Sequence, residues 1–104
     1  MVRGLAMSSQ ITLPRLVGTR EAANVLLSES ELSDDLRNSP VLVLSRALST
    51  ATSSFADELL RRLQERNASE IVLVGAPAEF VGFMKRAAQR RAYVGVRVAT
   101  AEDV

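Results

Sequence analysis

The chain has 104 residues, neither cysteine nor histidine, and 13 basic against 12 acidic residues, which leaves a formal net charge of +1. This length suits one domain with a core of its own. The missing residue types exclude disulfides, thiol catalysis, histidine-based triads and most zinc sites, and the balanced charge gives no general attraction to nucleic acid or membranes.

The first ten residues contain one arginine and only a short apolar stretch, which is not typical of a secretory signal. The longest apolar runs have four residues, far fewer than the roughly 20 that span a bilayer. We therefore expect a cytoplasmic protein with no membrane segment. We also expect residues 1–10 to be a disordered terminus and residues 11–104 to form the single domain.

Four segments have the pattern of β-strands. Residues 41–44 and 71–74 are apolar and β-branched and lack the alternation of a strand with one wet face, so they predict buried strands. Residues 94–98 alternate, and residues 10–13 are short and stop at Pro14, which favours strands nearer the edges of the sheet.

Helical spacing separates these strands. The clearest helix is predicted over residues 56–66, where apolar residues recur at Ala56, Leu59, Leu60 and Leu63. A second is predicted from Pro77, in its first turn, to Arg91. Its apolar stripe consists of Phe80, Phe83, Met84, Ala87 and Ala88.

A further helical segment is predicted after Gly18. Its apolar positions are Ala22, Val25, Leu26, Leu32 and Leu36. Residues 28–31 offer a fresh cap within it, so one bent helix and two short helices both remain open. Strands alternating with helices predict an α/β fold with about four mainly parallel strands and about three to four helices.

A run of small hydroxyl residues, 49–54, lies between a buried strand and the clearest helix, where α/β proteins often bind ligands or partners. Ser54 followed by Asp57 matches a capping box, so we predict Ser54 as the N-cap, with Ser53 just outside the helix. These hydroxyls either cap the helix and satisfy the loop or, at Ser53, accept a phosphate. Asp57 and Glu58, expected in the first turn, would repel such a dianion.

A family resemblance rests on the same segment. Residues 53–59 read Ser-Ser-Phe-Ala-Asp-Glu-Leu, which is similar to the signature of a bacterial STAS-like family of unknown function, related to the anti-anti-sigma (STAS) domains. Residues 18–21, Gly-Thr-Arg-Glu, look like a second segment of that family, and the resemblance covers roughly residues 11–75. It implies a STAS-like domain that regulates a partner protein by binding it and turns over no substrate.

In STAS domains a serine in an Asp-Ser-Ser-Gly turn is phosphorylated by a partner kinase, and the resemblance makes Ser53 the candidate phosphoacceptor. Here Thr52 stands in place of the Asp and Phe55 in place of the Gly. The Phe55 ring either packs into the core or contacts the partner. The candidate partner-binding residues are Arg20, Thr52, Ser53, Ser54, Phe55, Glu58 and Arg62.

Three functions compete on this basis. We favour a protein-interaction module whose partner is a regulatory protein, with an ATPase-type kinase as the partner that the resemblance suggests. The alternative is a nucleic-acid-associated protein that uses arginine-bearing helix faces, which otherwise are simply solvated. The basic residues concerned are Arg61, Arg62, Arg66, Lys85, Arg86, Arg90 and Arg91.

An enzyme ranks last. The chain's one lysine, Lys85, lies on a helix stripe, and no paired carboxylates are identifiable near the hydroxyl run. The acidic cluster has the spacing of a solvated helix face and not of a calcium loop. That cluster consists of Glu29, Glu31, Asp34 and Asp35. We therefore expect no catalytic residues, no cofactor and no metal, and pairing with a second copy stays open.

Overall fold

The computed structural model describes residues 9–30, 32–33, 35–37 and 39–99, and it has the predicted α/β architecture. Four parallel strands form the main sheet in the order β1 (Ser9–Thr12), β3 (Val41–Leu44), β5 (Ile71–Val74) and β6 (Val96–Val98). The helices between them are α1 (Arg20–Glu29), α2 (Ser53–Glu65) and α3 (Ala78–Arg90). A second, two-stranded parallel sheet consists of β2 (Leu16–Val17) and β4 (Thr50–Ala51).

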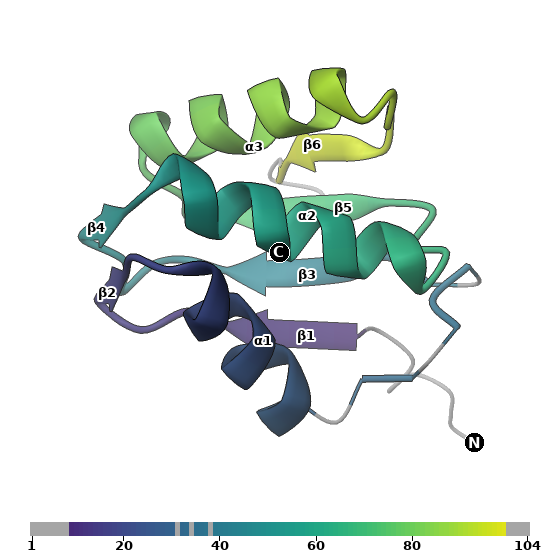
Figure 1. The fold of residues 1–104 in the computed structure, drawn as a ribbon, viewed down its shortest axis with the longest axis horizontal. Coiled ribbons are helices and arrows are strands. Elements are labelled where there is room, and N and C mark those ends of the chain that lie inside the picture. Colours follow the sequence, from purple (N-terminus) through teal and green to yellow (C-terminus); the bar gives the residue numbers. More distant parts are fainter. Residues whose placement is uncertain (1–8, 31, 34, 38, 100–104) are drawn as a thin grey trace.

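All three helices cover the same face of the main sheet (Figure 1). The strands follow one another across the sheet in chain order, so each crossover moves one strand over in the same direction. Because such crossovers are right-handed, each helix is placed on the same side. The helices form one layer in which α2 lies between α1 and α3 (Figure 1).

The positions of the strands agree with the sequence pattern. The two apolar runs are the central strands β3 and β5, and the two less apolar ones, β1 and β6, are the edges. The first strand begins earlier than the predicted domain boundary. Ser9 and Gln10, which we expected in the disordered terminus, belong to β1 and pair with Val41 and Leu42. Residues 1–8 lie outside the described residues.

The core lies between the sheet and the helix layer. The strands contribute Ile11, Val41, Val43, Ile71 and Leu73, all 0 % exposed. Phe55 and Phe80, at the start of α2 and α3, fill the same space with their ring centroids 6.3 Å apart. These two rings join the two helices to the central strands.

The first helical segment is shorter than its apolar spacing suggests. The helix α1 ends at Glu29, and Leu32 and Leu36 lie outside any helix of the described chain. Leu36 is nevertheless 1 % exposed, and its N–H donates to the Arg66 carbonyl at 2.7 Å. The segment therefore contains one helix followed by an irregular stretch that still buries an apolar side chain. Glu31 and Asp34 lie outside the described residues.

The other two helices lie close to where the pattern predicts them. The helix α3 ends at Arg90, and Pro77 occupies its N-cap position. The helix α2 begins at Ser53, three residues before the apolar stripe suggests. In the part of the chain that the structure describes, no helix combines the length and the apolar character needed to cross a membrane.

Candidate functional site

The strand-to-helix turns that follow β1 and β3 form one continuous surface at the carboxyl edge of the main sheet. After β1 the chain enters β2 and then α1, and after β3 it enters β4 and then α2. The Arg15 carbonyl accepts hydrogen bonds from the N–H groups of Ser49 and Thr50, at 2.8 and 3.0 Å. The two-stranded sheet thus holds the starts of α1 and α2 side by side (Figure 1).

We call this region the carboxyl-edge surface. Its exposed residues are Arg15, Leu16, Arg20, Ser49, Thr50, Ser53 and Ser54. A hollow of about 360 Å³ lies within it, lined by Arg15, Leu16, Ser49 and Thr50. Leu16 is 69 % exposed although its neighbour Val17 is 2 % exposed, because alternate residues of the strand β2 face opposite sides.

Thr52, and not Ser54, caps the helix α2. The Thr52 Oγ1 accepts a hydrogen bond from the Phe55 N–H at 3.2 Å and donates one to the Gly18 carbonyl at 3.0 Å. The prediction of Ser54 as the cap, with Ser53 outside the helix, was wrong, because the contact with Gly18 fixes the start of the helix two residues earlier. Thr52 therefore uses its hydroxyl within the fold.

The cap makes a testable contrast between two neighbouring hydroxyls. Thr52→Ala is expected to lower the free energy of unfolding by about 1 kcal/mol, because it leaves a first-turn N–H without its acceptor. Ser54→Ala, at an exposed helical position, is expected to change it by less than about 0.5 kcal/mol. Urea unfolding followed by circular dichroism measures both. Equal losses for the two variants would contradict the assignment of the cap.

The remaining hydroxyl and aromatic candidates separate by exposure. Ser53 and Ser54 are both exposed, in the first turn of α2. Phe55 is 0 % exposed, so its ring belongs to the core and does not reach the surface where a partner could bind. The core interpretation of Phe55 is therefore the correct one, and the residue leaves the list of contact candidates.

Asp57 collects arginines from two other helices. Its side chain is only 10 % exposed and accepts from Arg91 at 3.0 and 2.8 Å and from Arg20 at 2.9 Å. Arg90 lies 3.5 Å from the same carboxylate. The hydrogen bonds from Arg91, followed by those from Arg20, hold the pKa of Asp57 well below its usual value against the effect of burial.

Glu58 forms a second centre beside the first. Its side chain is 5 % exposed and accepts from Arg61 at 2.7 Å and Arg62 at 3.1 Å, with Arg20 at 3.5 Å. Glu58 and Arg62 lie four residues apart in the helix, a spacing that favours such a pair. Hydrogen bonds from Arg61 and then Arg62 lower the pKa of Glu58 to about 2. Glu58 therefore mainly forms ion pairs within the fold, whereas Arg62 stays partly exposed.

These contacts correct the expected electrostatics of the turn. Asp57 and Glu58 lie in the second turn of α2, because the helix begins at Ser53. Their charges are matched by five arginines within 4 Å, from all three helices. The sequence pattern alone suggests that Asp57 and Glu58 repel a phosphate at the start of α2. In the structure their charges are matched by arginines, so this repulsion is removed.

The basic helix residues are distributed over several environments. Arg61 also contacts Glu65 at 2.8 Å, and the Arg86 guanidinium lies 5.4 Å from the centre of the Phe83 ring. Arg90 stays 57 % exposed at the end of α3. Ion pairs and ring contacts thus occupy much of the arginine set that a nucleic-acid interface would need.

Sequence reasoning missed two parts of this site. The strands β2 and β4 have two residues each, too few for any periodic pattern, so the hollow between them had no signal. The position of Asp57 did give a signal in the sequence. It lies next to Ala56 on the edge of the buried stripe, where a carboxylate needs a partner. Nothing in the sequence pointed to Arg91 as that partner.

A comparison of this chain with models of protein families, with curated proteins and with solved structures finds no match. The described residues contain no group of three acidic side chains that could hold a metal ion.

Proposed function

We propose that this protein is a non-catalytic regulatory module, related to the bacterial anti-anti-sigma STAS domains, that binds a cytoplasmic partner protein through its carboxyl-edge surface. The resemblance of residues 53–59 and 18–21 supplies the class of protein. The observation that carries the proposal is the exposed Leu16 in its hollow, framed by Arg15 and by the starts of two helices.

The chemistry of this surface supports binding of a protein. Leu16 offers an apolar anchor, and the hollow beside it offers backbone and hydroxyl groups for hydrogen bonds. The exposed Arg15 adds positive charge to the same turn region. An apolar centre with a polar and charged rim is the composition of a protein–protein contact.

Ser53 is the residue at which we propose regulation, with an ATPase-type kinase as the partner. The kinase would transfer the terminal phosphoryl group of ATP to the Ser53 Oγ, releasing ADP and the hydroxyl proton. The acceptor is exposed at the first position of α2, where a phosphate gains from the helix N–H groups. The arginines that neutralise Asp57 and Glu58 remove the nearest repulsion.

The proposal predicts which substitutions abolish binding. The tagged protein is used to capture partners from an extract of its own cells, and captured proteins and Ser53 phosphopeptides are identified by mass spectrometry. Leu16→Asp and Arg15→Glu are expected to reduce recovery of one specific protein at least about tenfold, the scale of a lost anchor residue. Circular dichroism checks that both variants fold.

A matched control carries the same charge change at the other end of the sheet. Arg37 is 62 % exposed and pairs with Asp35 before β3, away from the carboxyl edge. Arg37→Glu is therefore expected to capture the partner as the wild type does. Recovery that survives in Leu16→Asp and Arg15→Glu, or that falls equally in Arg37→Glu, would overturn the proposed surface.

A further inference from the structure

The outer edge of β6 carries backbone groups that no described strand pairs. The Ile71 N–H donates to the Gly95 carbonyl at 2.8 Å, and the Ala99 N–H donates to the Leu73 carbonyl at 2.9 Å. In a parallel ladder, alternate residues bond to opposite neighbours, so Arg97 faces β5 and the backbone groups of Val96 and Val98 face outward. Within the described ranges β6 is the last strand of the sheet on that side.

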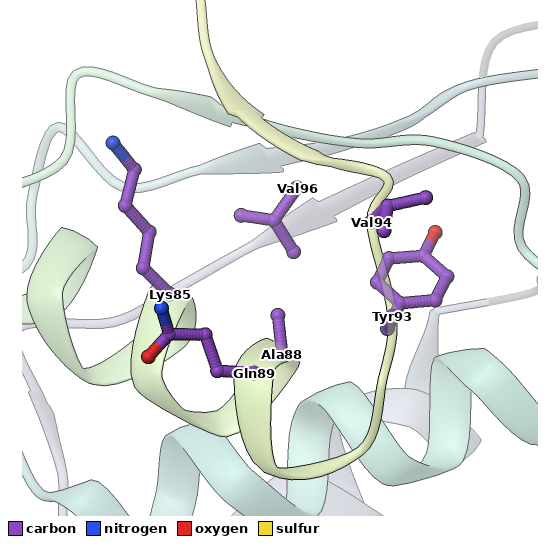
Figure 2. Close-up of a pocket in the computed structure, with 6 residues that line it drawn as sticks. All are labelled: Lys85, Ala88, Gln89, Tyr93, Val94 and Val96. Atoms are coloured by element: carbon purple, nitrogen blue, oxygen red, sulfur yellow. The ribbon is translucent and has the colours of Figure 1, made fainter.

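A hollow lies beside this edge, between β6 and α3. It has a volume of about 230 Å³ and is lined by Lys85, Ala88, Gln89, Tyr93, Val94 and Val96. Figure 2 shows the Val96 side chain at its centre, with Ala88 below it and Val94 and the Tyr93 ring at one end. Most of the lining is apolar, so the hollow suits an aliphatic side chain.

The walls of the hollow are fixed by contacts within the fold. The Tyr93 hydroxyl donates to the Ala68 carbonyl at 2.6 Å, and burial raises the pKa of Tyr93 to about 12. At Gly95, a Cβ atom would lie 2.4 Å from the Ser69 carbonyl oxygen, so only glycine allows this approach to the strand. Val94, in contrast, is 98 % exposed and lines the hollow from the solvent side.

Lys85 gives the hollow a charge. Its ammonium group points away from Val94, toward the carboxyl-terminal side of β6 (Figure 2). In the described part of the chain, no carboxylate lies within ion-pairing distance of it. Alternate residues of a strand share a face. On a strand added at this edge, an acidic side chain two residues from an apolar side chain in the hollow would therefore lie beside Lys85.

We propose that the β6 edge binds an extended segment of a partner protein by strand addition, with an aliphatic side chain in the hollow and an acidic side chain, two residues away, at Lys85. Strand addition combines main-chain hydrogen bonds with pockets for alternate side chains, which are the two features present here. This site is separate from the carboxyl-edge surface and does not depend on it.

The charges favour such a segment over a second copy of this chain. Residues 93–99, which contain β6, include no acidic residue, so the β6 strand of a second copy would offer Lys85 no carboxylate. An acidic partner segment would form an ion pair with Lys85.

The test uses short blocked peptides and the isotope-labelled full chain. The probes contain Glu-Thr-Val or Val-Thr-Glu between threonines, because strands can add in either direction, and control peptides carry Lys in place of Glu. Backbone amide shifts are followed during titration. One Glu peptide is expected to shift the amides of Val94, Val96 and Val98 and to protect those of Val96 and Val98 from hydrogen exchange.

Two variants separate the proposed contacts from general effects. Val98→Pro removes an outward N–H without breaking the ladder to β5 and is expected to weaken binding at least about tenfold, whereas Val98→Thr keeps the N–H and the affinity. Lys85→Glu is expected to weaken binding of the Glu peptide by up to about fivefold and to favour the Lys peptide.

Three outcomes would overturn the proposal. The first is that no Glu peptide shifts the amides around Val96 at millimolar concentration. The second is that Val98→Pro binds as well as Val98→Thr while the unperturbed core amides show both to be folded. The third is a dimer, seen by sedimentation, that protects Val96 and Val98 and is lost in Val98→Pro, which would make a second copy the occupant.

Discussion

Phe55→Ala is expected to lower the free energy of unfolding by about 3–5 kcal/mol, the largest loss from any single substitution considered for this chain. The Phe55 side chain is fully buried and contacts the Phe80 ring. Alanine removes most of its apolar area from the core and leaves a cavity that helix α2 cannot close, since Thr52 fixes its start. The total free energy of unfolding of a small domain is roughly 5–15 kcal/mol, so this substitution removes much of the stability.

Phe83→Ala provides the comparison, because the Phe83 ring is only partly buried and lies under the Arg86 guanidinium. Its loss is expected to be about 1–2 kcal/mol, in proportion to the smaller area removed from water. Urea unfolding by circular dichroism measures both variants. If Phe55→Ala unfolded at the urea concentration of Phe83→Ala or above, the ring would not have the core role that its burial indicates.

This expectation also affects tests of function. A protein weakened by Phe55→Ala would lose partners because it unfolds, so such a loss says nothing about contact. Leu16 and Arg15 are better probes, since their side chains are exposed and their substitution leaves the core intact.

The sheet was predictable because burial leaves a direct mark on strand composition. Residues 41–44 and 71–74 are the two central strands, and their apolar residues Val41, Val43, Ile71 and Leu73 are 0 % exposed. Pro14 ended the first strand as expected, because proline cannot donate to a ladder. With helices between the strands, parallel pairing followed.

The cap of α2 was not predictable from local rules. The pair Ser54 and Asp57 satisfies the spacing of a capping box, and Thr52 with Phe55 does not. The choice is decided by the hydrogen bond between Thr52 and Gly18, which are 34 residues apart in the chain. A contact of that range leaves no trace in the spacing of nearby residues.

The predicted extent of the first helical segment was wrong for a different reason. Leu32 and Leu36 continue the helical spacing, yet the chain leaves the helix at Glu29 and still buries Leu36. Apolar spacing reports which residues face the core but not the backbone conformation that brings them there. The bond from the Leu36 N–H to the Arg66 carbonyl shows that tertiary contact, not helix geometry, positions this residue.

The arginines around Asp57 and Glu58 show how far the candidate site could be predicted from the sequence. The contact of Glu58 with Arg62 within α2 joins residues four apart, a spacing that favours such pairs. Sequence spacing did not predict Arg20 or Arg91 beside Asp57, because these come from other helices. The repulsion of a phosphate that the sequence predicted at the start of α2 is therefore offset by arginines that it did not predict.

Asp57→Asn is expected to cost about 2 kcal/mol of unfolding free energy at neutral pH, the scale of hydrogen bonds to a charged group. Asparagine keeps the shape but removes the charge that holds Arg91 and Arg20 against α2. Both arginines keep some exposure and can regain water, so the loss stays below that of a fully buried ion pair. Glu79→Gln, at an exposed carboxylate of α3, is the control and is expected to change little.

The pH dependence gives this prediction its sharpest form. The usual pKa values of Asp57 and Glu58 are 3.8 and 4.5, and their arginines lower both, that of Glu58 to about 2. Below about pH 4.5 the unfolded chain therefore binds protons that the folded chain does not, so the free energy of unfolding falls as the pH falls toward 2. In Asp57→Asn one of these two groups is missing, so the fall is shallower and the difference from the wild type narrows below pH 3.8. Urea unfolding over this pH range measures it, and a difference that stayed constant would mean that the Asp57 charge does not stabilise the helix layer.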